Sequence, residues 1–361
     1  MVLKERQFFL NLNIKKSMNK KTNITIIGAG SWGTTLSVLL SGRGYRINRW
    51  TSSKNTYNDI KNLRLNSRYT GSLHIPDNVK PFTAKKDVCI DSDIIIFAVP
   101  SQFLRDIIVR FYDVLDKNKK KIKCILNVAK GLEEGTKLRL SQVMQKCLPE
   151  ELKSLTCVLS GPNIASEVAA GLPSVSVVAS KNRNLTRYIQ ELMSGDKFRI
   201  YTNDDVIGVE IGGAVKNIIA IASGVSDGLG YKANTKASII TRGLYELTKF
   251  GVKLGAKPVT FSGVAGMGDL IATCISKKSR NRFFGEKIAE GEKVSKVLKD
   301  MYMVAEGVKT TRVVFNMSKG MGIEMPITEC VYRIIYKGLS PAESVKELMN
   351  RKFKSEVEDI T

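Results

Sequence analysis

Histidine and tryptophan are the scarcest residues in this 361-residue chain, with one and two copies. The single histidine, His74, lies between Gly71 and Pro76 and is predicted to occupy a loop. A zinc site of several imidazoles is therefore excluded, and a Ser-His-Asp triad would have to be built on this one loop residue. We expect neither a metal centre nor histidine-based acid/base chemistry.

Cysteines and long apolar runs are also few. No apolar run approaches the ~20 residues that cross a bilayer, and the short run Asp93–Pro100 is typical of a buried strand, so we expect no membrane insertion. The cysteines show no C-x-x-C spacing, and several lie in strand-like runs, which favours buried thiols in a reducing compartment. They are Cys89, Cys124, Cys147, Cys157, Cys274 and Cys330.

Acidic residues are too few to balance the basic ones. With 57 Lys+Arg against 34 Asp+Glu, the formal net charge is +23. A nucleic-acid-binding protein is therefore one open interpretation. The basic residues are spread along the whole chain, however, and aromatic residues make up 7% without a basic-aromatic block. This distribution favours a solvated surface that attracts small anionic substrates.

The length suggests two domains. Residues 1–21 are set aside as a leader because they show no sustained periodicity. From residue 22 to about 203, strand-like runs alternate with helical stretches, as in βαβ units with a mainly parallel sheet. After residue 203 the pattern is helical to residue 361. The expected strands are Ile24–Ile27, Tyr45–Trp50, Ile94–Val99, Cys124–Val128, Cys157–Leu159, Ser174–Ala179 and Phe198–Tyr201, and the expected C-terminal helices are Val206–Ala222, Lys236–Gly251, Arg282–Glu290, Val308–Lys319, Thr328–Lys337 and Pro341–Arg351.

A G-x-G-x-x-G motif, formed by Gly28, Gly30 and Gly33, lies between the first strand and the helical stretch Trp32–Gly42. In that context the first glycine permits a tight turn, the second admits a pyrophosphate and the third packs helix on strand. The pattern predicts a Rossmann-like doubly wound sheet that binds a dinucleotide, followed by an all-helical domain. The second strand is followed by Thr51-Ser52-Ser53-Lys54 without an acid, so hydroxyls and Lys54 would accommodate a 2′-phosphate and NADP is favoured over NAD.

Longer blocks point to one family. In order they are AVPSQ (98–102), AKGLE (129–133), SGPNIASEVAAGLPS (160–174), GVEIGGAVKNIIAIASGVSDGLG (208–230), ITRGLYEL (240–247), GMGDLIATCISKKSRNRFFG (266–285), VAEG (304–307) and MPI (325–327). Together they resemble the bacterial-type NAD(P)-dependent glycerol-3-phosphate dehydrogenases over residues 22–350. The resemblance implies a cytoplasmic enzyme that interconverts sn-glycerol 3-phosphate and dihydroxyacetone phosphate and feeds phospholipid synthesis.

Hydride transfer at a carbinol carbon requires a proton donor and acceptor. Lys216 lies among small and apolar residues, and burial there would lower its pKa towards neutrality, although the local pattern alone favours a surface lysine. The resemblance implies that Lys216 is the proton acceptor and that Asp269 and Thr273 belong to its catalytic hydrogen-bond network. Lys130, after the fourth strand, would polarise the substrate oxygen and lower the Lys216 pKa by repulsion, with a turn lysine before Gly131 as the alternative. Asp269 is also a candidate N-cap for the segment LIATC.

The substrate phosphate needs charge-assisted donors, which Ser279, Arg280 and Asn281 supply in succession. A basic surface turn is the alternative. The resemblance implies that this triplet binds the phosphoglycerol end of the substrate. Further substrate-binding residues implied by it are Lys130, Gly161, Asn217 and Asn163. Asn163 stands where the family commonly has serine.

The resemblance also implies a set of cofactor-binding residues. Arg280 and Lys130 would contact both cofactor and substrate, and the absence of a basic residue near Ser52 puts recognition of a 2′-phosphate in doubt. The full set is Gly28, Gly30, Ser31, Trp32, Gly33, Ser52, Tyr69, Pro100, Lys130, Ala165, Arg280, Val304 and Glu306.

Three interpretations follow from the sequence. The first is the glycerol-3-phosphate dehydrogenase, a predicted homodimer with a small phosphorylated substrate and no nucleic-acid partner. The second keeps the two-domain nicotinamide architecture but acts on a 3-hydroxyacid or a phosphogluconate, since fold does not fix substrate. The third is the nucleic-acid-binding protein suggested by the net charge.

Overall fold

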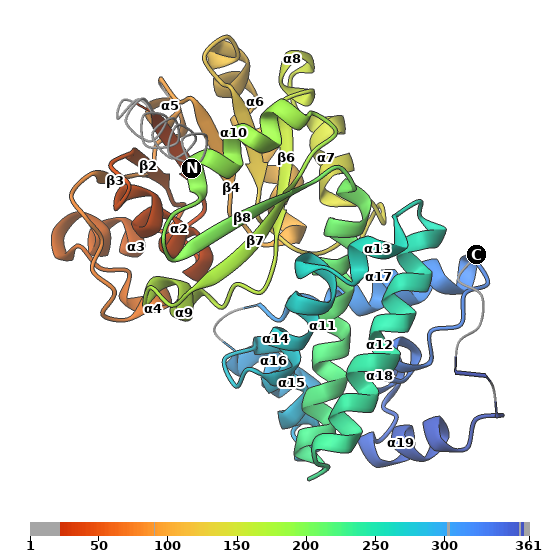
Figure 1. Cartoon of the computed structure of the whole chain (residues 1–361). Coiled ribbons are helices and arrows are strands. Elements are labelled where there is room, and N and C mark those ends of the chain that lie inside the picture. Colours follow the sequence, from red (N-terminus) through yellow and green to blue (C-terminus); the bar gives the residue numbers. More distant parts are fainter. Residues whose placement is uncertain (1–21, 90, 302–303, 354, 357–361) are drawn as a thin grey trace, which may run out of the picture.

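The computed structural model describes residues 22–89, 91–301, 304–353 and 355–356. The predicted leader, residues 1–21, lies outside the described residues. Figure 1 shows two halves side by side, a sheet covered by helices and a cluster of helices around α11.

An eight-stranded sheet forms the first half, in the order β3-β2-β1-β4-β5-β6-β7-β8. Neighbouring strands run parallel except for β6 and β7, which are antiparallel. The predicted doubly wound fold class is therefore confirmed. The strands are β1 (Asn23–Ile27), β2 (Arg46–Trp50), β3 (Val79–Phe82), β4 (Ile94–Phe97), β5 (Cys124–Asn127), β6 (Thr156–Ser160), β7 (Ser174–Ala179) and β8 (Phe198–Asn203).

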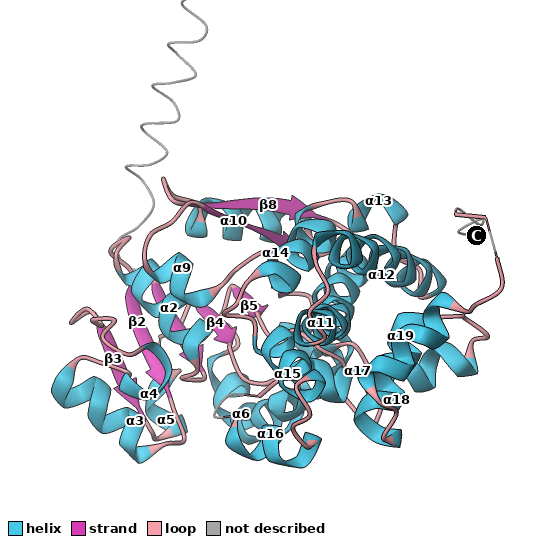
Figure 2. Cartoon of the chain, turned by 90° about the horizontal axis from the view of Figure 1, so that it is seen from below, coloured by secondary structure: helices cyan, strands magenta, loops and turns pink. Residues whose placement is uncertain are grey.

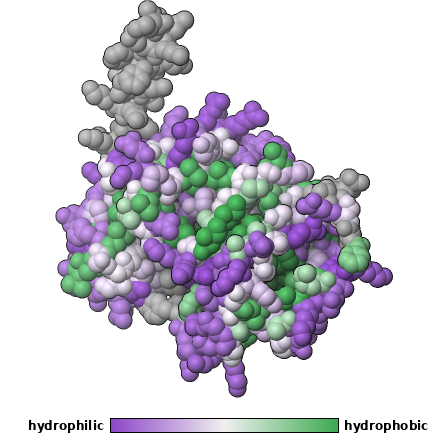
Figure 3. All heavy atoms as spheres, turned by 60° about the horizontal axis from the view of Figure 1, so that its bottom comes forward, coloured by the Kyte–Doolittle hydropathy of each residue, from purple (hydrophilic) through white to green (hydrophobic). Residues whose placement is uncertain are grey.

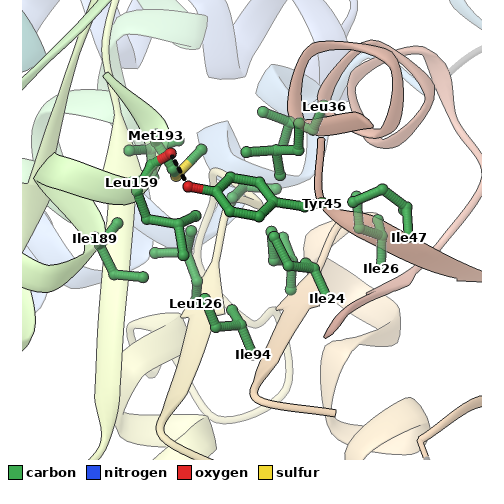
Figure 4. Close-up of a cluster of buried hydrophobic side chains, with 14 of the residues drawn as sticks. Ile24, Ile26, Leu36, Tyr45, Ile47, Ile94, Leu126, Leu159, Ile189 and Met193 are labelled. Atoms are coloured by element: carbon green, nitrogen blue, oxygen red, sulfur yellow. Dashed lines mark hydrogen bonds between the residues drawn. The ribbon is translucent and has the colours of Figure 1, made fainter. Parts of the chain in front are cut away.

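Because both faces of the sheet are covered, its central strands are apolar on both sides. Ile24 and Ile26 of β1 point into a cluster that also contains Tyr45 and Leu126, while Ile27 faces a second cluster on the other side of the sheet. Figure 4 shows Tyr45 lying across the first cluster, with its hydroxyl donating to the carbonyl of Leu192 at 3.3 Å. The two clusters hold the strand ends in fixed positions.

The helices of the sheet half connect and cover the strands. They are α2 (Ser31–Ser41), α3 (Lys54–Asn58), the π-helix η1 (Asp59–Leu63), α4 (Ser67–Thr70), α5 (Lys85–Val88), the 3₁₀-helix η2 (Ser101–Phe103), α6 (Leu104–Asn118), α7 (Leu140–Cys147), α8 (Glu150–Lys153), α9 (Ala165–Ala169) and α10 (Arg183–Met193).

The second half is helical and is built around α11 (Val206–Gly228), which starts three residues after β8 ends at Asn203. Figures 1 and 2 both show α11 enclosed by other helices of this half. The others are α12 (Ala233–Lys253), α13 (Pro258–Phe261), the π-helix η3 (Val264–Gly268), α14 (Asp269–Ile275), α15 (Arg280–Ala289), α16 (Val294–Asp300), α17 (Glu306–Gly320), α18 (Pro326–Lys337) and α19 (Pro341–Met349).

Sequence periodicity missed several short elements. The edge strand β3 contains Lys80 and Pro81, which interrupt the apolar pattern of a strand. The strand is defined by its parallel pairing with β2. In the helical half, α13, η3, α14 and α16 are each seven residues or shorter, too short to show a helical repeat.

Two helical stretches of the described residues are long and apolar enough to cross a membrane, by length and composition alone. This corrects the expectation that no stretch approaches that length. The first, Val206–Gly228, is α11, whose apolar window is 78% buried inside the protein. The second, Pro258–Ile275, is assembled from α13, η3 and α14. The burial of α11 is that of a core helix, and the absence of membrane insertion stays a prediction.

The six cysteines are unpaired, and all are buried except the half-buried Cys147. The prediction of buried free thiols is confirmed for the other five. His74 is exposed in the loop between α4 and β3.

Candidate active site

A cavity of about 1380 Å³ lies between the two halves, at the carboxyl ends of β1, β4 and β5. The chain crosses from β3 back to β4 at this point, and open α/β sheets bind ligands where the strand order reverses. The volume exceeds the ~300–1,000 Å³ of sites for drug-sized ligands, so the cavity is large enough for a dinucleotide together with a small substrate. On the face seen in Figure 3, hydrophobic side chains gather near the centre with hydrophilic ones around them.

The glycine-rich turn after β1 forms one end of this cavity. Gly28 has φ +118°, and a Cβ there would lie 2.3 Å from the carbonyl oxygen of Ala98. A Cβ on Gly33 would lie 2.7 Å from the carbonyl oxygen of Gly28, whereas one on Gly30 would meet nothing within 4 Å. Gly30 is the N-cap of α2, and no side chain caps the helix. The turn therefore presents uncapped N–H groups to open space, an arrangement that fits a pyrophosphate.

A buried ion cluster lies on the helical side of the cavity. Lys216 of α11 is 6% exposed; its Nζ donates to Oδ1 of Asp269 and, at 2.8 Å, to Oγ1 of Thr273. Asp269 is 1% exposed, and its Oδ2 accepts from Nζ of Lys130 at 2.7 Å. Two ammonium groups thus share one carboxylate, and this trio carries a net charge of +1. Such a cluster favours an anionic or strongly polarised oxygen beside it.

Burial is the main reason that the Lys216 pKa falls from its usual value to about 7. The charge of Lys130 lowers this pKa further, while Asp269 acts in the opposite direction. A pKa near neutrality is what a general acid/base requires.

The close approach of α11 to the sheet brings Lys216 to this position. A Cβ on Gly213 would lie 2.6 Å from Oγ of Ser160, at the end of β6. Residues 213 and 216 share a helix face. Without a side chain at Gly213, the helix contacts the strand end directly and carries Lys216 to the carboxyl edge of the sheet.

Gly161 positions Lys130 through its backbone. Its carbonyl oxygen accepts from Nζ of Lys130 at 2.9 Å. Gly161 has φ +152°, and a Cβ there would lie 2.9 Å from Cα of Ser176. The glycine therefore permits a conformation in which the carbonyl faces the lysine.

The predicted phosphate-binding triplet lies at the start of α15. Ser279 is the N-cap, with Oγ accepting from the N–H of Arg282 at 3.3 Å. Arg280 donates to the carbonyl of Val304 at 3.0 Å. Asn281 is buried and uses both ends of its amide inside the protein: Nδ2 donates to Oδ1 of Asn217 at 2.9 Å, and Oδ1 accepts from the N–H of Gly307 at 2.9 Å.

Asn163 has its amide bound to β7. Nδ2 donates to the carbonyl of Val175 at 2.9 Å, and Oδ1 accepts from Oγ of Ser176. It lines the cavity, yet both polar atoms of its side chain already have protein partners.

Glu306 links the two halves beside the cavity. It is the first residue of α17, and its carboxylate accepts from the N–H of Ser101 at 3.1 Å and from the Ser101 hydroxyl. Burial raises the pKa of Glu306, and the hydrogen bonds from Ser101 oppose that rise. Ser101, in the segment AVPSQ, was not identified by sequence reasoning; its place after a central parallel strand was the available signal.

Most of the sequence-predicted site residues line this one cavity. They are Gly28, Gly30, Ser31, Trp32, Ser52, Tyr69, Pro100, Lys130, Asn163, Ala165, Lys216, Asn217, Thr273, Ser279, Arg280, Asn281, Val304 and Glu306. Gly33, Gly161 and Asp269 stand behind the wall. Gly33 permits close packing of the turn on α2. Gly161 and Asp269 accept hydrogen bonds from the lysines that line the cavity.

One expectation is wrong. Asp269 is not an N-cap: the cap of α14 is Gly268, and the Asp269 carboxylate faces the two lysines. Lys54 does not line the cavity, although Ser52 and Ser53 do. Among the described residues, no group of three or more His, Cys, Asp and Glu side chains is placed to hold a metal ion.

Comparison with known proteins gives one family along almost the whole chain. Residues 23–186 match the family model described as the NAD-dependent glycerol-3-phosphate dehydrogenase N-terminus, and residues 205–346 match the corresponding C-terminus. A glycerol-3-phosphate dehydrogenase (NAD(P)+) of Chlorobium limicola is 43% identical over 335 residues, 93% of this chain and 99% of that protein. The protein of the same name from Clostridium tetani is 41% identical over 99% of this chain and 100% of its own.

Solved structures agree. The crystal structure of glycerol-3-phosphate dehydrogenase from Coxiella burnetii superposes with a TM-score of 0.85 at 36% identity, over 92% of this chain and 100% of that one. A D-mandelate dehydrogenase at 12% identity and a TM-score of 0.58 shares the fold alone.

Proposed function

The chain belongs to the NAD-dependent glycerol-3-phosphate dehydrogenase family, and we propose that it interconverts sn-glycerol 3-phosphate and dihydroxyacetone phosphate with Lys216 as the proton donor and acceptor. The single observation that carries this mechanism is the buried cluster of Lys216, Lys130 and Asp269 at the cavity wall. The enzyme is an oxidoreductase that uses NAD(P).

A bound nicotinamide supplies or accepts the hydride. The chain's own residues handle the proton. Two of the three N–H bonds of the Lys216 ammonium point to Asp269 and Thr273, and the third is available to the oxygen on the middle carbon of the substrate. In reduction, Lys216 gives its proton to that oxygen; in oxidation, the neutral amine takes the proton back. Lys130 stabilises negative charge on the oxygen as the bond order changes.

The phosphate group of the substrate would lie at the start of α15. Arg280 and Lys278 line the cavity there, and Ser279 begins the helix. A guanidinium and an ammonium attract a dianion, and the Arg280 fork suits phosphate geometry. Asn281 holds Asn217 and α17 in place beside this group. A 3-hydroxyacid without a phosphate would not need this arrangement.

The dinucleotide would lie along the glycine-rich turn, with its pyrophosphate at the N-terminus of α2. Ser31, Trp32, Tyr69, Pro100 and Ala165 form the walls around it. Val304, Glu306 and Arg280 close the cavity from the helical side.

The pH dependence of both reaction directions should report the Lys216 pKa of about 7. Oxidation needs the neutral amine, so kcat/KM for glycerol 3-phosphate should rise with pH and level off above about 7. Reduction needs the ammonium, so kcat/KM for dihydroxyacetone phosphate should fall above about 7. The second pKa of a phosphate is ≈ 6, so the alkaline limb of the reductive profile is the clean measurement. A reductive profile that stays flat from pH 6 to 9 would contradict the proposal.

A substrate panel tests the function itself. The full chain should oxidise NADH or NADPH with dihydroxyacetone phosphate, measured by the absorbance of the reduced nicotinamide. The same chain with NAD or NADP should show far less turnover of 6-phosphogluconate and 3-hydroxyacids. Turnover of those compounds alone would favour the second interpretation. Salt-dependent binding of duplex or single-stranded nucleic acid, without dehydrogenase activity, would favour the third.

We also propose two domains, residues 22–203 and 204–361, a homodimer, and a cytoplasmic location that supplies phospholipid synthesis. The six unpaired thiols suit a reducing compartment. Light scattering of the purified chain tests the dimer.

A further inference from the structure

The end of β2 is where a Rossmann-like site distinguishes NAD from NADP, through a carboxylate on the ribose hydroxyl or a cation on the 2′-phosphate. In this chain the end of β2 brings neither group to the cavity. Thr51 is buried, and its Oγ1 accepts from the N–H of Ser53 at 3.1 Å. The Ser53 hydroxyl in turn accepts from the N–H of Thr56 at 3.2 Å. Ser52 is exposed and lines the cavity, and Lys54 does not line it.

A cation from another element lines the cavity. Helix α6 contributes Asp106, Ile107 and Arg110 to the cavity, and residues three and four apart share a helix face. The Arg110 guanidinium lies over the ring of Trp50, 5.9 Å from its centroid. Trp50 is the last residue of β2 and also lines the cavity. Arg110 therefore reaches the end of β2 from a different element.

The Arg110 guanidinium is exposed, and no carboxylate of the described residues forms an ion pair with it. Its recorded contacts are the Trp50 ring and, through its backbone carbonyl, Nζ of Lys85 at 2.9 Å. Asp106 lies one turn earlier on the same wall and would repel a phosphate, so it is the opposing charge at this site.

We propose that Arg110 is the specificity-determining residue that binds the 2′-phosphate of NADP, with the Ser52 hydroxyl as a second donor. A planar guanidinium pairs with phosphate through two parallel hydrogen bonds. This assignment rests on the proposed function for the orientation of the dinucleotide, with its pyrophosphate at α2 and its adenosine beyond the end of β2. In this proposal a residue of α6, and not one at the end of β2, supplies the cation that recognises the 2′-phosphate.

Binding of two fragments tests the proposal without turnover. The probes are 2′,5′-ADP and 5′-AMP, which differ by the 2′-phosphate, titrated by calorimetry into the full chain. Arg110→Gln should weaken 2′,5′-ADP by about 10- to 100-fold, the size of one charge-assisted contact, and should weaken 5′-AMP much less. Arg110→Lys should recover part of the loss, and Asp106→Asn should not weaken 2′,5′-ADP.

Lys54→Gln is the matched control, since it removes one cation near the same strand end but outside the cavity wall. It should leave both affinities unchanged. If Arg110→Gln lowers the affinities for both fragments equally, Arg110 only stacks on adenine. If Lys54→Gln selectively lowers the affinity for 2′,5′-ADP, Lys54 binds the 2′-phosphate. Either result, or no change in Arg110→Gln, overturns the proposal.

Kinetics separates this inference from the proposed function. The ratio of kcat/KM for NADPH to that for NADH, with dihydroxyacetone phosphate, should fall in Arg110→Gln by a factor similar to the loss in fragment affinity. If the native chain does not reduce dihydroxyacetone phosphate, the proposed function fails, while the fragment titration still decides the role of Arg110.

Discussion

Replacing Lys216 with methionine is expected to lower kcat for dihydroxyacetone phosphate reduction by about 10²–10⁴-fold, the usual contribution of a positioned acid/base. The Nζ of Lys216 lines the cavity wall and is held by Asp269 and Thr273, and no other ammonium in the described site has this pair of partners. Methionine fills similar space without a proton to transfer. Steady-state kinetics with saturating NADH or NADPH measures the loss.

The folded state should tolerate this change. Asp269 keeps the ion pair with Lys130 at 2.7 Å and the hydrogen bond from Oγ of Ser160 at 3.4 Å. Removing one partner of a buried ion pair is costly when it leaves the other charge unpaired, and here the Asp269 carboxylate keeps Lys130 as its counter-charge. The melting temperature should therefore stay near that of the native chain, and the alkaline limb of the reductive pH profile should disappear. Lys253→Met, on the exposed side of α12, is the matched control and should keep both the rate and the pH profile. A loss of less than about tenfold in Lys216→Met would remove Lys216 from proton transfer.

Replacing Asp269 with asparagine is expected to destabilise the protein by about 3–5 kcal/mol, because Lys130 loses its buried counter-charge and Lys216 is forced towards its neutral form. The carboxylate is 1% exposed and pairs with both Lys216 and Lys130. Denaturant titration measures the free energy of unfolding. Asp204→Asn, which breaks the exposed pair with Lys257, should leave the titration midpoint unchanged.

Asp269→Asn should also change the pH dependence of stability and of rate. The Asp269 charge raises the pKa of Lys216, so its loss lowers that pKa further below about 7. The unfolded chain then binds more protons than the folded one over a wider range, and stability should rise more steeply from pH 6 to pH 9 than in the native chain. The alkaline limb of the reductive profile should move to lower pH. An unchanged profile together with unchanged stability would show that Asp269 does not set the charge of the cluster.

The accuracy of sequence reasoning differed between local and distant features. The glycine-rich turn was predictable because Gly28, Gly30 and Gly33 act within one strand–turn–helix unit. The order of alternating strands and helices was also predictable, since apolar periodicity is local. Strand β3 was not, because Lys80 and Pro81 carry no strand pattern and the strand is defined by its pairing with β2.

Residues that act across distant elements were harder to interpret. The local pattern around Lys216 favours a surface lysine, and only the resemblance pointed to a role in proton transfer. Asp269 has the local pattern of an N-cap, yet its partners lie 53 and 139 residues away. Ser101 and Arg110 were not identified from the sequence, because their partners Glu306 and Trp50 come from other elements.

The sequence by itself determined the alternating architecture, the dinucleotide turn and the family, because each depends on residues that are close together in the chain or on blocks that can be read in order. The tertiary structure alone decided the chemistry of the site. It places α11 against β6 at Gly213, brings two lysines to one carboxylate and lowers the Lys216 pKa by excluding water. The burial of these residues, and the distances between their charges, are set only when the two halves pack against each other.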